Sequence, residues 1–138
     1  MIILDTNVVS EPLRLAPSTN VMEWIRSRPN AVMFTTTITE AELLYGIALL
    51  PQSKRRSSLE SAVRREFTVQ FTGRILPFDS AAAHEYAEIA ATRRRAGRPI
   101  SDSDARIAAI ARSRGAELAT RNVADFAGCG LEVINPWL

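Results

Sequence analysis

Three chemically versatile side chains are almost absent from this sequence of 138 residues, which contains one cysteine (Cys129), one histidine (His84) and one lysine (Lys54). A single cysteine excludes a disulfide framework and a zinc site built from cysteines. A single histidine gives no basis for a Ser-His-Asp triad, and the sequence has no glycine-rich phosphate-binding loop. Nucleophilic catalysis therefore has no support in the sequence.

Long apolar runs are also absent. The longest apolar helical segment, residues 41–50, is interrupted by Glu42 and Gly46 and is too short to span a bilayer. The N-terminus has no basic region ahead of its apolar residues, and Asp5 interrupts them, which is not the pattern of a signal peptide. We therefore expect a cytoplasmic protein.

The composition is that of a globular protein, with 46% apolar and 23% charged residues. A chain of 138 residues suits one domain with a proper core, residues 1–138. The net charge is only +2, from 17 basic and 15 acidic residues. The run Arg93 to Arg95, with Arg98, is typical of a solvated helix end; contact with a nucleic-acid backbone is the alternative.

Short apolar runs alternate with longer helical patterns, which predicts an α/β fold with a mainly parallel sheet of about five strands flanked by helices. Thr6 and Asn7 are the predicted caps of the helix after the first strand, and Ser18 caps the next one. The predicted strands are 1–4, 31–38, 75–78, 117–120 and 131–134, and the longer predicted helices are 39–50, 52–71, 80–96 and 101–114.

Acidic residues gather where these strands lead into helices. Asp5 follows the first strand, Glu42 lies early in the helix after the second, Asp102 and Asp104 open a helix, and Asp125 follows the fourth strand. The carboxyl ends of parallel strands share one edge, so these side chains can converge there. Converging carboxylates repel one another unless a cation neutralises them, and Mg²⁺ or Mn²⁺ prefers such oxygen ligands.

The same acidic residues also fit a purely structural role. Thr39 and Glu42 have the spacing of a capping box, as do Ser101 and Asp104 with Asp in place of Glu. Acidic residues in a first turn complement the helix dipole as well. A carboxylate directly after a buried strand, such as Asp5, needs partners in either case. From composition and spacing, the cap and the metal site both stay open.

The ordered motifs resemble those of PIN-domain proteins, and within them the VapC and FitB branch of toxin–antitoxin systems. The match runs from Met1 to Trp137, and the order of the motifs is more specific than any one of them. The stretches that carry the resemblance are MIILDTNVVSEP at 1–12, TEAELLYG at 39–46, GRILPFD at 73–79, DARIAA at 104–109, ATRNVADF at 119–126 and NPW at 135–137.

The resemblance implies a metal-dependent ribonuclease that is the toxin of a pair and is held inactive by a cognate antitoxin. Asp5, Glu42 and Asp104 match the three core acidic positions. The resemblance implies that each binds Mg²⁺ or Mn²⁺, directly or through water, in a site that activates water against an RNA phosphodiester. Thr6 matches the hydroxyl residue that supports the first Asp.

The fourth acidic position departs from the family pattern. Similar sequences can carry Asp soon after the strand's Thr, where this chain has Asn122, and Asp125 lies nearly one helical turn further on. Either residue can take the fourth place, which leaves open whether the site holds one metal ion or two. Asp102, two residues before Asp104, is an additional outer-shell candidate.

The resemblance also implies a homodimer and an antitoxin segment that lies along helices near the acidic residues. Trp24, Ile25, Leu44 and Ile47 are the candidate apolar contacts, unless they belong to the core. A non-catalytic RNA- or partner-binding module on the same fold is the alternative function. A phosphoacceptor domain fits poorly, because Lys54 lies in a mid-chain helix instead of after a late strand.

Overall fold

A computed structural model describes all 138 residues, and its centre is one parallel five-stranded sheet in the order β3-β2-β1-β4-β5. The parallel register pairs Ile3 of β1 with Phe34 of β2 and with Leu118 of β4. The first strand of the chain is therefore the central strand of the sheet. The strands are β1 (Ile2–Leu4), β2 (Met33–Thr36), β3 (Ile75–Leu76), β4 (Glu117–Ala119) and β5 (Val133–Ile134).

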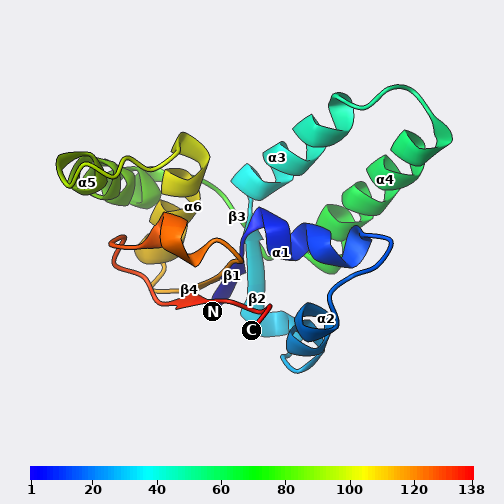
Figure 1. Ribbon diagram of the computed structural model, residues 1–138, viewed down its shortest axis with the longest axis horizontal. Coiled ribbons are helices and arrows are strands. Elements are labelled where there is room, and N and C mark those ends of the chain that lie inside the picture. Colours follow the sequence, from blue (N-terminus) through cyan, green and yellow to red (C-terminus); the bar gives the residue numbers. More distant parts are fainter.

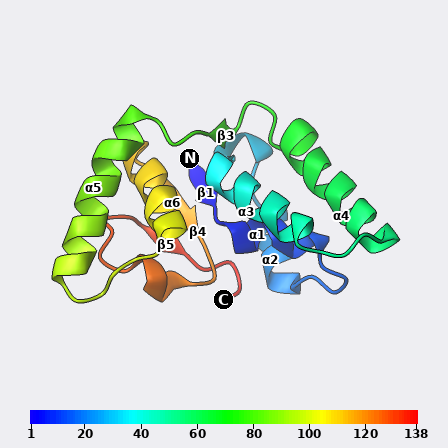
Figure 2. The same cartoon turned by 90° about the horizontal axis from the view of Figure 1, so that it is seen from above.

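Helices lie on both sides of this sheet, with α5 and α6 grouped on one side and α1 to α4 on the other (Figures 1 and 2). The α-helices are α1 (Thr6–Ser10), α2 (Thr19–Arg26), α3 (Thr37–Ala48), α4 (Lys54–Arg65), α5 (Ser80–Arg95) and α6 (Asp102–Ser113). Shorter helical turns are η1 (Glu11–Leu13), η2 (Asn30–Val32), η3 (Glu66–Gln70) and η4 (Val123–Phe126).

The two helix groups bury two separate apolar clusters against the sheet. Side chains alternate between the two faces of a strand, so Ile3 belongs to the cluster under α5 and α6, while Ile2 and Leu4 belong to the cluster under α1 to α4. Phe67 and Phe71 are core residues of the second cluster. A central parallel strand covered on both faces reads as a continuous apolar run, and this is why β1 was visible in the sequence.

The predicted α/β class and the parallel sheet are confirmed, with differences at element ends. The predicted strand 31–38 is shorter, because η2 precedes β2 and Thr37 already belongs to α3. The predicted helix 52–71 is divided into α4 and the π-helical turn η3. This turn brings Phe67 and Phe71 into the core together, with ring centroids 6.2 Å apart.

Two of the predicted helix caps are wrong. Asp5 itself caps α1 by accepting a hydrogen bond from the Thr6 N–H, so Thr6 and Asn7 are not the cap. The cap of α3 is Thr36 and not Thr39, because the helix begins as soon as β2 ends. The Thr36 hydroxyl accepts the hydrogen bond from the Thr39 N–H. The predicted caps Ser18 and Ser101 are confirmed.

None of the helices combines the length and the apolar character that crossing a membrane requires.

Candidate active site

Asp5 is the most buried of the predicted site residues, with 5% of its surface exposed. It stands at the end of the central strand, where its Oδ1 accepts the Thr6 N–H at 2.8 Å and its Oδ2 accepts the Thr120 hydroxyl at 2.7 Å. The Asn7 amide lies 3.5 Å from the same Oδ2. These contacts fix the carboxylate in one orientation at the carboxyl edge of the sheet.

The environment of Asp5 opposes its negative charge. Burial is the largest cause and raises its pKa from 3.8 to about 6, although the hydrogen bonds from Thr120 and Thr6 act in the opposite direction. The charges of Asp104 and Glu42 raise the pKa further, which requires both carboxylates to lie near Asp5. The structure therefore brings together the three residues that the resemblance assigned to the core positions.

Glu42 reaches this edge from α3, although its side chain is exposed. Its Oε1 accepts the Thr6 hydroxyl at 2.9 Å. The Thr6 hydroxyl is in turn 3.1 Å from the hydroxyl of Thr39, which is fully buried. Thr6 thus supports Asp5 through its backbone and Glu42 through its side chain, while Thr39 supports Thr6 instead of capping the helix.

Asp104 approaches from the opposite side of the sheet, in the first turn of α6. The Ser101 hydroxyl accepts the Asp104 N–H at 3.2 Å, so the predicted cap and the predicted ligand occupy the same turn. Burial is the first cause that raises the pKa of Asp104, and the charge of Asp125 raises it as well. The Ser101 contact and the charge of Arg93 lower it.

The residues predicted around this core have different surroundings. Asp125 is exposed in η4, and its charge acts on Asp104. Asn122 is exposed and donates its backbone N–H to the Thr120 hydroxyl at 3.1 Å. Asp102 accepts hydrogen bonds from Tyr86 and Arg106, at 2.7 and 2.9 Å. Its outer-shell role stays a prediction.

The carboxylates are not arranged as a closed ligand cage. No group of three His, Cys, Asp or Glu side chains is set to hold one metal ion. Magnesium commonly binds through one or two protein carboxylates and completes its shell with water and substrate phosphate. The chemistry of the donors fits such an ion, because the charges of two further carboxylates, Asp104 and Glu42, act on the buried carboxylate of Asp5.

Two supporting residues were missed in the sequence. The Thr120 hydroxyl donates to Asp5 and accepts from Asn122, and it is fully buried. Asn7 donates to Asp5 and Thr120 and accepts the Arg121 N–H. Thr120 lies 115 residues from Asp5 in the chain. The sequence does show Thr120 at the end of the predicted strand 117–120. This position indicates a contact with Asp5 only once β4 is known to pair with β1.

A groove of about 830 Å³ opens beside the site between η1, α3 and α4. Glu42 lines it together with mostly apolar side chains, which include Leu43, Ile47 and Leu59. Of the apolar candidates from the sequence, Ile47 lies in this groove, and Trp24 and Leu44 pack against the core cluster. The groove connects an apolar surface with one of the acidic residues.

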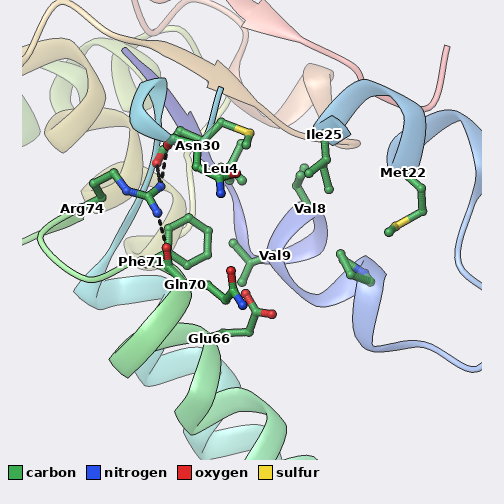
Figure 3. A pocket seen from close by; sticks show the side chains of 12 residues that line it. Leu4, Val8, Val9, Met22, Ile25, Asn30, Glu66, Gln70, Phe71 and Arg74 are labelled. Atoms are coloured by element: carbon green, nitrogen blue, oxygen red, sulfur yellow. Dashed lines mark hydrogen bonds between the residues drawn. The ribbon is translucent and has the colours of Figure 1, made fainter. Parts of the chain in front are cut away.

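A smaller cavity of about 190 Å³ lies between α1, α2 and the π-helical turn η3 (Figure 3). Ile25 lines it, as does Glu66, whose pKa is raised first by burial. Arg74 closes one end by donating to the carbonyls of Asn30, Met33 and Gln70. None of the four acidic candidates of the site lines this cavity.

A parallel sheet with acidic residues after β1, in α3, in α6 and in η4 is the arrangement expected for a PIN domain. The family model described as "PIN domain" matches residues 2–127. The chain belongs to the PIN domain family.

Curated relatives match almost the whole chain. It is 44% identical over 137 residues to plasmid stability protein StbB of Pseudomonas syringae pv. tomato, with 99% of both proteins covered. It is 39% identical to VapC ribonuclease Y4jK of Sinorhizobium fredii, covering 99% of this chain and 98% of that protein. It is also 39% identical to toxin FitB of Neisseria gonorrhoeae, with 99% of both covered.

Solved structures agree with this relationship. The crystal structure of FitAcB from Neisseria gonorrhoeae has a chain that is 39% identical, with a TM-score of 0.92 and 99% of both chains covered. A chain in the structure of FitAB bound to an IR36 DNA fragment has a TM-score of 0.93 at 38% identity, with 100% of this chain and 96% of that chain covered.

Proposed function

We propose that this protein is a metal-dependent endoribonuclease that acts as the toxin of a toxin–antitoxin pair. The observation that carries the proposal is the convergence of Glu42 and Asp104 on buried Asp5 at the carboxyl edge of the sheet. The similarity to a VapC ribonuclease and to a toxin named FitB supports the reaction class and the biological role.

In this proposal the chain holds Mg²⁺ or Mn²⁺ through Asp5, with Glu42 and Asp104 as direct or water-mediated ligands. When bound, such an ion supplies a hydroxide nucleophile at neutral pH and stabilises charge on the phosphoryl group. The charge of Asp125 acts on Asp104. In this proposal Asp125 adds a further negative charge on the Asp104 side of the site. Asn122 offers a carbonyl oxygen without charge, so the proposal includes one metal ion.

The neighbouring groups keep these carboxylates in place. Thr120 and the Thr6 N–H hold the two oxygens of Asp5, and both contacts lower its pKa. The Thr6 hydroxyl holds Glu42, and the helix turn capped by Ser101 holds Asp104. These residues orient the acidic groups without entering the reaction.

Cleavage of a mixed RNA pool by the antitoxin-free protein tests this function. The assay compares Mg²⁺, Mn²⁺ and EDTA, with Asp5→Asn as the inactive variant and Asp79→Asn as the matched control. Asp79 is an exposed cap of α5 outside the site. We expect metal-dependent cleavage by the wild type and the control only. RNA binding without cleavage under any metal favours the non-catalytic module instead.

The groove beside Glu42 is the proposed seat of an antitoxin segment. Its apolar lining suits apolar side chains of a partner. An Arg or Lys from that segment would pair with the acidic residues and replace the neutralising cation. Co-expression with the neighbouring reading frame should give a stable complex that lacks ribonuclease activity, and an absent complex contradicts this part of the proposal.

A homodimer completes the proposed assembly. Tyr45 and Leu49 near the end of α3 and Val69 in η3 are exposed apolar side chains, with 67%, 68% and 58% of their surfaces accessible. Light scattering on the purified chain should give twice the mass of 15.2 kDa. A monomer at micromolar concentration contradicts the dimer.

A further inference from the structure

Arg93 is buried, in contrast to the solvated helix end predicted for this arginine run. It lies in the last turn of α5 with 8% of its surface exposed, whereas its neighbours Arg94 and Arg95 are exposed. A buried guanidinium needs hydrogen-bond partners, because the desolvation of an unpaired charge is costly. The hydrogen-bond partners of Arg93 indicate its structural role.

The guanidinium joins two loops that are distant in the sequence. Its Nε donates to the Arg98 carbonyl at 2.7 Å, in the segment that leads from α5 into α6. Its Nη1 donates to the carbonyls of Asp125 and Ala127, at 2.7 and 3.0 Å. The rigid fork of the guanidinium therefore fixes the turn that carries Asp125 relative to the segment before α6.

The shape of the Asp125 turn matches this contact. Gly128 has a φ angle of 74°, a left-handed conformation that favours glycine and lets the chain turn back beside Arg93. A Cβ added at Gly128 would lie 4.0 Å from Cδ of Arg93, so the turn packs directly on the arginine stem. Cys129 Sγ lies 3.7 Å from Nη1.

Both sides of this junction carry acidic residues of the candidate site. Asp104 lies in the first turn of α6, and Asp125 lies in the turn held by Nη1. The charges of Asp125 and Arg93 both act on Asp104. The arginine thus lies close enough to set the geometry and to influence the local charge.

We propose that Arg93 is a positioning residue that sets the placement of Asp125 relative to Asp104 by tying the Asp125 turn to the segment before α6. It contacts backbone carbonyls and leaves the carboxylates free for other partners. The effect on metal binding and cleavage rests on the proposed function, whereas the effect on the Asp125 turn does not.

Positioning and simple charge predict opposite results for metal affinity. Removing a nearby positive charge strengthens cation binding if the carboxylates stay in place. Removing the tie displaces Asp125 and weakens cation binding. The sign of the change in Mn²⁺ affinity therefore separates the two roles.

The test compares Arg93→Gln, Arg93→Lys and the matched control Arg94→Gln, which removes the same charge from an exposed neighbouring position. Backbone amide NMR follows residues 125–129, Mn²⁺ binding is measured by electron paramagnetic resonance without RNA, and cleavage gives kcat and KM. We expect both Arg93 variants to shift those amide signals. In Arg93→Gln, misplacement should weaken Mn²⁺ binding and lower kcat by about tenfold or more, with KM changed by less than about threefold.

Arg93→Lys keeps the charge without the fork, so it should lie between wild type and Arg93→Gln, and Arg94→Gln should bind Mn²⁺ like the wild type. A folded Arg93→Gln protein with unchanged amide signals and kcat overturns the proposal, and so does tighter Mn²⁺ binding. If Arg93→Gln does not fold, Arg93→Lys decides by the same criteria. If the wild type neither binds Mn²⁺ nor cleaves RNA, the proposed function fails, and the amide signals still decide whether Arg93 fixes the turn.

Discussion

The substitution Asp5→Asn should change how the stability of the protein depends on pH. Burial, followed by the charges of Asp104 and Glu42, raises the pKa of Asp5 from 3.8 to about 6. The folded protein therefore binds a proton at this position more tightly than the unfolded chain does. Since the folded state binds more protons in this range, the free energy of unfolding falls as the pH rises.

The size of this effect follows from the difference between the two pKa values. It corresponds to about 3 kcal/mol of stability that is fully present below the unfolded value and is lost as the pH rises through the folded value. Asn cannot ionise, so the free energy of unfolding of the Asp5→Asn variant does not fall in this way as the pH rises. The other titrating groups act in both proteins and largely cancel in the difference.

Urea unfolding in EDTA, followed by circular dichroism between about pH 4 and pH 7, measures the effect. At pH 4 about 0.5 kcal/mol of this stability is already lost, so we expect the free energy of unfolding of Asp5→Asn minus that of the wild type to rise by about 2.5 kcal/mol across this range. Asn also loses part of the contact with Thr120, which shifts the whole curve without changing its slope. A difference that changes by less than about 0.5 kcal/mol across the range refutes the reasoning.

Adding Mg²⁺ at the upper end of this pH range extends the test. A ligand that binds only the folded state stabilises it by mass action. In the proposed site, Mg²⁺ should restore stability to the wild type and leave Asp5→Asn unchanged. Equal stabilisation of both proteins places any ion elsewhere.

Three other substitutions test the surroundings of the site. Thr120→Val removes the hydroxyl that donates to Asp5 and accepts from Asn122; it should lower the free energy of unfolding by about 1–3 kcal/mol in urea titrations and raise the pKa of Asp5 further. Asn122→Asp adds a carboxylate near the site, so Mn²⁺ binding should tighten, and unchanged affinity means that this residue does not face the ion. Gly46→Leu adds a side chain where a Cβ meets nothing within 4 Å; the helix should gain about 1 kcal/mol of stability, while the filled groove should lose affinity for the antitoxin in a pull-down titration.

The parts of the fold that follow from local pattern could be predicted from the sequence. The run Ile2–Leu4 is apolar because the central strand is covered on both faces, and a parallel sheet places the residue after it at a shared edge. The convergence of Glu42 and Asp104 on Asp5 follows from the same rule. These positions depend on the order of elements more than on exact boundaries.

The parts that depend on distant segments could not be predicted. Thr36 and Thr39 both fit a helix cap, and only the end of β2 decides that Thr36 takes this role. Arg93 looks like its exposed neighbours in the sequence, because its burial comes from a turn more than thirty residues later. Thr120 is buried against Asp5 through the pairing of β4 with β1. In each case a local pattern left alternatives that tertiary contacts resolved.

The contacts of Asp5 also explain how one residue can serve the fold and a metal site together. A carboxylate has about four lone-pair positions, and the Thr6 N–H and the Thr120 hydroxyl use one on each oxygen at short distance. These contacts cap α1 and fix the side chain, yet the pKa stays raised because burial is the larger influence. The remaining lone pairs and the nearby charge of Glu42 and Asp104 favour a cation more strongly than another neutral donor. The arrangement therefore stores an unfavourable charge in the folded chain, and metal binding in the proposed function is the step that relieves it.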